Sequence, residues 1–270
     1  MKVLKKLGIL GLVLGLTMSV VACSSKDSKE DNKKEDTSSG DNVTLNISAA
    51  ASLQEAMVEL EEKFKDIEPQ VKLEINLGAS GALQQQIEEG APCDVFISAG
   101  EKQMTALEDK DLLLDGSNKT LLSNDLVLVN SEDKDIKGLK ELSTDDITKI
   151  AIGDPESVPA GKYAKEVLDN TKLYDTVKDK LVLAKDVKEV LSWVQQGNAE
   201  AGFVYLSDTI DAEGVKIALT TTEDTHSPIN YPIAVLKASE KQDKAKAFED
   251  FLLSEEGQTI LEKYGFKKAK

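Results

Sequence analysis

The sequence contains no arginine, and all 33 of its basic residues are lysines. Arginine is the side chain whose planar fork binds a phosphate, sulfate or carboxylate through two parallel hydrogen bonds. A clamp of that kind is therefore excluded. If the chain binds an anion, lysines or neutral dipoles must hold it.

Histidine and cysteine are also scarce. His226 is the single histidine, which leaves little material for a His-based metal site or a Ser-His-Asp triad, and we expect it in the core or on the surface. The two cysteines, Cys23 and Cys93, predict no disulfide framework, because Cys23 is assigned below to a lipid. Cys93 is expected to be a small buried hydrophobe, with a nucleophile or a metal ligand as the alternatives. The chain is therefore predicted not to be an enzyme and to carry no cofactor.

Acidic residues outnumber basic ones by 49 to 33, for a net charge of −16. Loss of Lys2, Lys5 and Lys6 with the N-terminal segment described next would take this charge to −19. A surface of this sign repels nucleic acid and acidic membranes. We therefore expect no nucleic-acid partner, and membrane contact through a lipid anchor only.

The first 22 residues have the features of a lipoprotein signal peptide. Lysines precede an apolar stretch from Leu7 to Val21, which ends in "VVAC" at Cys23. Cleavage before Cys23 would leave that cysteine to carry the lipid, and an uncleaved anchor is the alternative. The next residues, "SSKDSKEDNKKEDTSSGDN", contain no apolar side chain. We predict a lipid-anchored, disordered stalk over 23–42, on the outer face of the cytoplasmic membrane, and the lysine-only basic set favours a Gram-positive source.

The remaining chain alternates between strand and helix patterns, which predicts an α/β fold. The order β-α-β-α-β at its start indicates a parallel sheet with helices on its faces. The strands are predicted at 43–48, 71–78, 93–99, 125–130, 149–154, 180–184, 201–208 and 229–237, and the helices at 53–67, 80–90, 160–169, 187–196 and 241–263, the last broken near Ser254. Two lobes of roughly a hundred residues each fit this length. We place the first at 43–123 plus 232–270 and the second at 124–231.

Four strand-to-helix junctions share small residues at the helix start. Ser52 and Glu55 fit a capping box, and Ser80 lies in "GASGAL". Ala160 follows Pro159 at an early helical position, and Val187 follows Asp186, which with Glu189 fits another box. The starts of helices carry positive partial charge and free N–H groups, so converging starts would bind an anion. Ordinary helix capping is the alternative at each junction.

Several motifs resemble those of the ModA family, the molybdate-binding proteins of ABC importers. They are "AAASLQEAM", "GASGALQQQIEEGAPCDVFISA", "GDPESVPAGKYAKEVL", "AKDVKEVLSWV", "AGFVYLSD" and "YPIAVLK". The resemblance covers nearly all of 43–267. It implies a two-lobed periplasmic-binding-protein type II fold, with two crossing segments and the ligand between the lobes.

The same resemblance implies a set of oxyanion-binding residues. They are the hydroxyls of Ser52 and Ser80, the backbone N–H groups of Ala160 and Val187, and the hydroxyl of Tyr205. "GASGA" has one serine where relatives have several, and Ser80 stands in the ligating place.

The implied function is that of a monomeric receptor, which takes molybdate, with tungstate, to an ABC permease and its ATPase. The metal of the oxyanion would have no direct protein ligand. The alternatives are a receptor selective for tungstate or sulfate, and a surface lipoprotein that binds no small ligand.

Overall fold

The computed structural model describes residues 42–269, which belong to one compact unit. The predicted signal peptide, Cys23 and nearly all of the predicted stalk lie outside the described residues. Among the helices that are described, none combines the length and the apolar character that crossing a membrane requires.

The first lobe is built on a six-stranded sheet with the order β11-β4-β10-β3-β1-β2. Its parallel part confirms the prediction from the β-α-β-α-β pattern, since β1 pairs with both β2 and β3 in parallel. The other half is antiparallel, because β10 runs against β3 and β4, and β11 runs against β4. The strands are β1 (Val43–Ala50), β2 (Val71–Gly78), β3 (Val95–Ile97), β4 (Lys119–Ser123), β10 (Asn230–Val235) and β11 (Lys267–Lys268).

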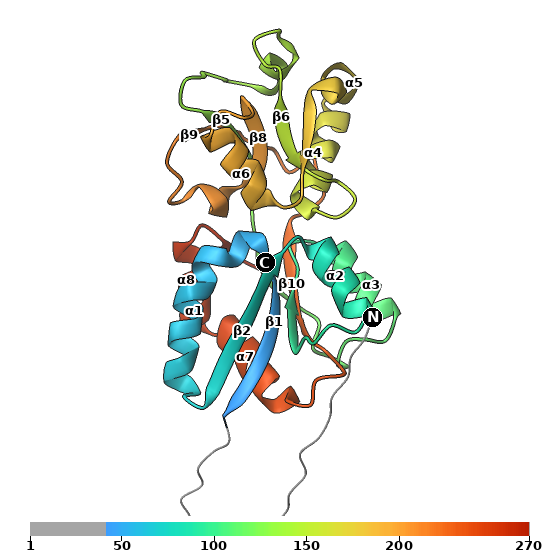
Figure 1. Ribbon diagram of the computed structural model, residues 1–270, viewed down its shortest axis with the longest axis vertical. Coiled ribbons are helices and arrows are strands. Elements are labelled where there is room, and N and C mark those ends of the chain that lie inside the picture. The colour runs from blue at the N-terminus through green and yellow to red at the C-terminus, as the bar shows by residue number, and fades with distance from the viewer. Residues whose placement is uncertain (1–41, 270) are drawn as a thin grey trace, which may run out of the picture. The chain divides into compact units, whose positions relative to one another are not determined.

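Helices cover both faces of this sheet. Val95 and Ile97 belong to a core with α1, α7 and α8, whereas Phe96 between them packs with α2 and α3. Successive side chains of a strand point to opposite faces, so the two helix groups lie on opposite sides of the sheet (Figure 1). The helices are α1 (Gln54–Ile67), α2 (Ser80–Glu88), α3 (Glu101–Asp109), α7 (Gln242–Leu253) and α8 (Glu255–Lys263).

The second lobe is built on a five-stranded sheet with the order β7-β6-β8-β5-β9. β6 is parallel to β7 and β8, and β5 is antiparallel to β8 and β9. The strands are β5 (Leu126–Ser131), β6 (Ile150–Gly153), β7 (Leu181–Ala184), β8 (Ala201–Tyr205) and β9 (Val215–Thr220). The helices of this lobe are α4 (Pro159–Asn170), α5 (Tyr174–Val177) and α6 (Val187–Gln195).

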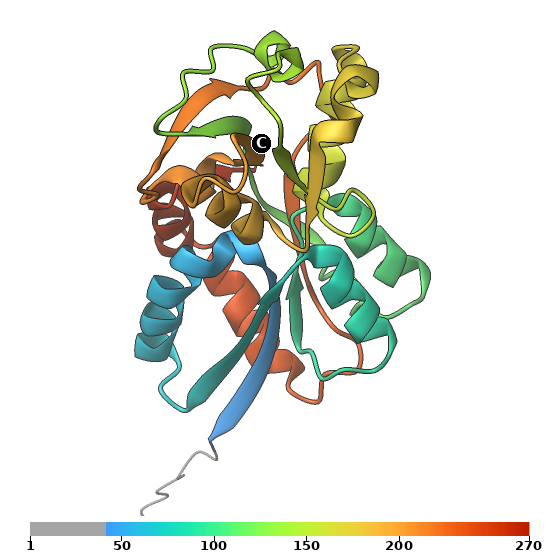
Figure 2. The same ribbon diagram turned by 45° about the horizontal axis from the view of Figure 1, so that its top comes forward.

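The chain passes between the two sheets twice, between β4 and β5 and again between β9 and β10. The prediction of two α/β lobes with two crossing segments is thereby confirmed. The predicted boundaries at 123/124 and 231/232 stay a prediction, and β10 begins within two residues of the second one. Figures 1 and 2 both place the start of α6 in the second lobe beside the start of α1 in the first.

The sequence patterns missed α3, α5, β4, β9 and the two-residue strand β11. α3 carries three buried side chains, Gln103, Met104 and Leu107, of which only two are apolar. β4 and β9 are short strands of five and six residues. The predicted break near Ser254 is confirmed: its hydroxyl donates to the Phe251 carbonyl and accepts from the Gly257 N–H as α8 begins.

Candidate functional site

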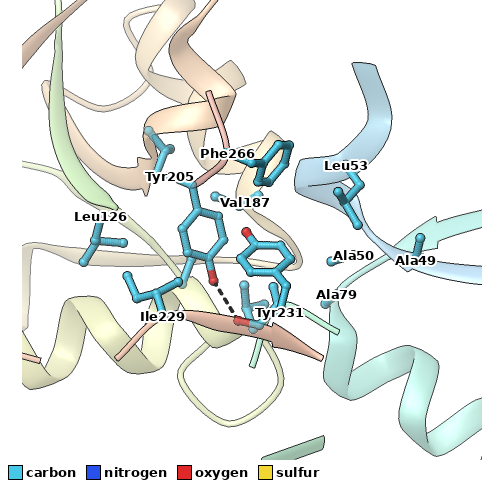
Figure 3. Close-up of a cluster of buried hydrophobic side chains, with 14 of the residues drawn as sticks. Ala49, Ala50, Leu53, Ala79, Leu126, Val187, Tyr205, Ile229, Tyr231 and Phe266 are labelled. Carbon is cyan, nitrogen blue, oxygen red and sulfur yellow. Dashed lines mark hydrogen bonds between the residues drawn. The ribbon is translucent and has the colours of Figure 1, made fainter. Parts of the chain in front are cut away.

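A small cavity brings the predicted site residues together. It has a volume of about 10 Å³, which is about the space of one water-sized sphere. Ser52, Ser80, Ala160, Val187 and Tyr205 all line it, together with residues 50, 51, 78, 79, 99, 158, 159 and 186. Figure 3 shows Val187 and Tyr205 of the second lobe at this place together with Ala50 and Ala79 of the first. That these residues bind a ligand stays a prediction.

Three of the segments that reach the cavity start with an apolar residue at the N-cap. Ala79 precedes α2, Val158 precedes α4, and Ala50 precedes the 3-10 turn Ala51–Leu53. None of these three positions has a side-chain hydrogen bond to the first turn that follows it. The first N–H groups of a helix have no intrahelical acceptor, so they are left to an acceptor from outside the helix.

The predicted capping box at Ser52 is wrong. A 3-10 turn precedes α1, so α1 begins only at Gln54 and Ser52 lies inside the turn. The Ser52 Oγ lies 2.9 Å from the Tyr231 hydroxyl, and the Glu55 carboxylate binds Lys188 Nζ at 2.6 Å. Ser52 is thereby free to face the cavity rather than its own helix.

Ser80 is the first residue of α2, as predicted. Its Oγ accepts a hydrogen bond of 2.9 Å from the Ala99 N–H, and its side chain is buried. The Tyr205 hydroxyl reaches the carbonyl of the same Ala99 from the second lobe, at a weak 3.4 Å. Burial raises the pKa of Tyr205 well above its ordinary value, so the phenol keeps its proton and remains a donor.

The start of α6 is capped as predicted by Asp186, whose Oδ1 accepts from the Glu189 N–H at 2.8 Å. The reciprocal half of the predicted box is wrong, because Glu189 accepts from the Lys185 N–H instead. Asp186 is the one acidic residue in the cavity lining. Its Oδ1 is occupied by its own helix.

Lys188 lies next to Val187 but outside the cavity lining. Its Nζ is 2.6 Å from Glu55 in the first lobe and 3.0 Å from Asp208 in the second. Burial lowers the pKa of Lys188, but Asp208 and Glu55 raise it by more, and the net shift is upward. No lysine lines the cavity, so an anion bound there would be held by neutral hydrogen-bond donors.

Sequence reasoning missed Tyr231 and Asn124. Tyr231 is buried, and besides Ser52 its hydroxyl contacts Asn124 Nδ2 at 3.3 Å. The motif "YPIAVLK" contained Tyr231, but nothing in its local pattern points to a partner 179 residues away. Figure 3 shows its ring beside that of Tyr205.

Two larger cavities, of about 450 Å³ each, flank the loop 239–241. They contain none of the five predicted site residues. Within residues 42–269, no group of three His, Cys, Asp or Glu side chains could hold a metal ion. Cys93 is buried and burial raises its pKa to about 11, which fits the packing role expected for it.

Comparisons with known proteins give one consistent answer. A family model described as bacterial extracellular solute-binding protein matches residues 45–267. The molybdate-binding protein ModA of Escherichia coli is 38% identical over 84% of this chain and 90% of its own. YvgL of Bacillus subtilis, assigned as a substrate-binding lipoprotein of an ABC transporter, is 40% identical over 97% of this chain and 98% of its own.

A solved structure agrees with these relatives. It is the substrate-binding domain assigned to a molybdenum ABC transporter of Clostridium difficile. It is 60% identical to this chain, superposes with a TM-score of 0.68, and the match covers 84% of this chain and 100% of that one. The predicted type II fold is confirmed.

Proposed function

The chain belongs to the bacterial extracellular solute-binding protein family, within its ModA group, and on this premise we propose that it is a receptor for molybdate, with tungstate, that serves an ABC permease. One observation supports this most directly. Ser52, Ser80, Ala160, Val187 and Tyr205, from two lobes and five separate stretches of chain, line a single cavity that contains no lysine.

The hydrogen-bond polarity of the site favours an anion without a proton. The Ser80 Oγ already accepts from the Ala99 N–H, so its own proton is left for the cavity. Tyr205 remains protonated, and the N–H groups of Ala160 and Val187 can only donate. Molybdate, tungstate and sulfate are fully deprotonated. The one carboxylate in the lining, Asp186, already accepts from its own helix through Oδ1, so a P–OH of hydrogen phosphate that does not reach it would be left unsatisfied at a cost of about 1–3 kcal/mol.

The size of the cavity restricts the ligand further. At about 10 Å³ the cavity is smaller than any candidate ligand, so the lobes must separate for a ligand to enter, and sugars, peptides and amino acids would require a wide separation. A tetrahedral oxyanion requires a smaller movement. Sulfate has the same charge and tetrahedral shape as molybdate, so only the size of the closed site can discriminate between the two anions. A sulfate receptor is therefore the second candidate.

The available donors are sufficient for tight binding. Hydrogen bonds to a charged group contribute about 1.5–3 kcal/mol each, so five donors supply roughly 8–15 kcal/mol before dehydration and closure are subtracted. A micromolar dissociation constant corresponds to about 8 kcal/mol. The two lobes contribute separate donors, so a bound ligand favours their closed arrangement, which is the form we expect the permease to recognise.

The location and partners follow from the same assignment. We propose that Cys23 carries the lipid, that the receptor is a monomer held outside the cytoplasmic membrane of a Gram-positive cell, and that it hands its ligand to the permease and ATPase. The relationship to YvgL over 97% of the chain supports a lipoprotein leader. The family is one of solute-binding receptors.

Isothermal titration of the full chain in mild detergent tests the proposal. We expect saturable binding of molybdate and tungstate, with sulfate and phosphate much weaker. Ser52→Ala should weaken molybdate binding by about 1–3 kcal/mol. The matched control is Ser117→Ala, a buried serine whose hydroxyl donates to the Leu114 carbonyl, away from the cavity. If sulfate binds as tightly as molybdate, the proposed substrate is wrong. If no oxyanion binds, the proposed receptor function is refuted.

A further inference from the structure

A chain of buried hydrogen bonds reaches Ser52 from behind the cavity. Asn124 Nδ2 contacts the Ser207 Oγ at 2.9 Å and the Tyr231 hydroxyl at 3.3 Å. The Tyr231 hydroxyl in turn lies 2.9 Å from the Ser52 Oγ. All four side chains are buried. Asn124 lies in one crossing segment between the lobes and Tyr231 at the end of the other.

The direction of these bonds is fixed at the Asn124 end. The Asn124 Oδ1 accepts from the Asp125 N–H at 2.9 Å, which sets the orientation of the amide group. An amide nitrogen only donates, so the Tyr231 oxygen must be the acceptor of its bond with Asn124. The single phenolic proton is then left for the Ser52 Oγ.

The consequence falls on Ser52. Its oxygen accepts from Tyr231, so its own proton is the part of the hydroxyl left for the cavity. Ser80 reaches the same state by another route, because its oxygen accepts from the Ala99 N–H. Both serines are therefore held with an acceptor position filled by the protein and a donor position available to a ligand.

We propose that Tyr231, oriented by Asn124, is a positioning residue that fixes Ser52 as a hydrogen-bond donor and so makes the site reject oxyanions that carry a proton. This inference rests on the proposed function. Without the Tyr231 hydroxyl, the Ser52 hydroxyl can rotate so that its proton points away from the ligand. A lone pair of its oxygen then faces the ligand and can accept from a P–OH group. Molybdate binding then weakens while binding of hydrogen phosphate improves relative to it.

The experiment measures affinity and selectivity together on the full chain in mild detergent. Molybdate is titrated by calorimetry, and phosphate is tested as a competitor between pH 6 and 9. For Tyr231→Phe we expect about a tenfold loss of molybdate affinity and a molybdate-to-phosphate preference reduced by a further several-fold. The control is Tyr163→Phe, another buried tyrosine outside the cavity lining, which should leave both quantities unchanged.

Asn124→Asp supplies a second variant that does not remove the tyrosine. A carboxylate at this position accepts from Tyr231, which turns the Tyr231 oxygen into the acceptor for Ser52 and draws the serine proton away from the cavity. A general effect of the added charge would weaken the two dianions, molybdate and hydrogen phosphate, alike, so the comparison is made at pH 8 to 9, where phosphate is a dianion. Reversal of the hydrogen-bond directions instead weakens the binding of molybdate more than the binding of hydrogen phosphate. Thermal unfolding confirms that each variant is folded.

The outcomes separate the two proposals. If the unmodified chain binds no oxyanion, the proposed function fails and the inference fails with it. A second outcome is that the unmodified chain selects molybdate and a folded variant, either Tyr231→Phe or Asn124→Asp, keeps the same preference for molybdate over phosphate. That result overturns the inference and leaves the proposed receptor function intact. A loss of affinity without a change in preference also overturns it, because a merely structural role predicts that result.

Discussion

The lobes meet at a glycine, and replacing it should separate binding from folding. The Gly81 N–H of α2 in the first lobe donates to the Ser157 carbonyl of the second lobe at 2.9 Å. A Cβ at position 81 would lie 2.5 Å from that oxygen and 2.8 Å from the Ser157 Cα, both backbone atoms. Gly81→Ala therefore cannot be accommodated by a side-chain movement, and the lobes must stay further apart.

The expected size follows from two contributions. Forced overpacking costs about 1–3 kcal/mol, and loss of a hydrogen bond about 0.5–1.5 kcal/mol. A destabilisation of the closed form by about 2–4 kcal/mol corresponds to a 30- to 1,000-fold loss of affinity. In the ligand-free protein the lobes can separate, and alanine is favoured over glycine inside a helix by about 1 kcal/mol. Thermal stability without ligand should thus be unchanged or slightly higher.

The assay pairs calorimetric titration of molybdate with thermal unfolding of the ligand-free protein. Gly138→Ala is the matched control, because a Cβ there meets no atom within 4 Å. Full affinity in Gly81→Ala would refute the reasoning, since the ligand would then bind without this contact. Equal losses of affinity and of ligand-free stability would show that Gly81 serves folding rather than closure.

Three further predictions concern ionisable groups. Lys188→Met should lower the free energy of unfolding by about 3–5 kcal/mol, because it leaves the fully buried Asp208 carboxylate with the Tyr205 N–H but without its cation. Glu55→Gln removes a half-exposed partner of Lys188 and should cost at most about 1 kcal/mol. Urea titration compares the two variants, and equal effects would contradict this account. Molybdate affinity should be constant from pH 7 to about 11, because burial raises the pKa of Tyr205 and keeps its proton in place. An ordinary tyrosine of pKa about 10 would have lost about nine-tenths of its protons at pH 11, so a roughly tenfold fall in calorimetry by that pH would argue against Tyr205 as a buried donor. Burial raises the pKa of Cys93 to about 11, so its thiol should resist iodoacetamide at pH 8 in the native protein and react after denaturation. Mass spectrometry of the peptide that contains Cys93 measures the labelling. Rapid labelling of the native protein would be inconsistent with the packing role.

The parts of the site that could be predicted are those encoded locally. Strand-to-helix junctions leave a signature of small residues within a few positions, and the starts at Ser80 and Val187 were located to the residue. The error at Ser52 came from the same reliance on local pattern. The spacing of Ser52 and Glu55 fits a capping box, but their partners are Tyr231 and Lys188, 179 and 133 residues away.

The missed elements have a related cause. α3 buries only two apolar side chains, so its helical period is too weak to read from the sequence. β9 is an edge strand with no buried residue, and β5 supplies its only pairing partner among the described strands. In both cases contacts with the surrounding fold stabilise the element, so the sequence of the segment alone gives no signal from which to predict it.

The place of β10 determines the order in which the protein can be completed. Synthesis and export proceed from the N-terminus, and all strands of the second lobe lie within 126–220. The first lobe begins earlier but ends later, because β10 must enter between β3 and β4, and α7 and α8 must then cover one face of its sheet. The lobe that starts first therefore finishes last, with the edge of β3 exposed while the second lobe is already complete. Shortened chains that end near residue 225 should carry a folded second lobe attached to an aggregation-prone first one.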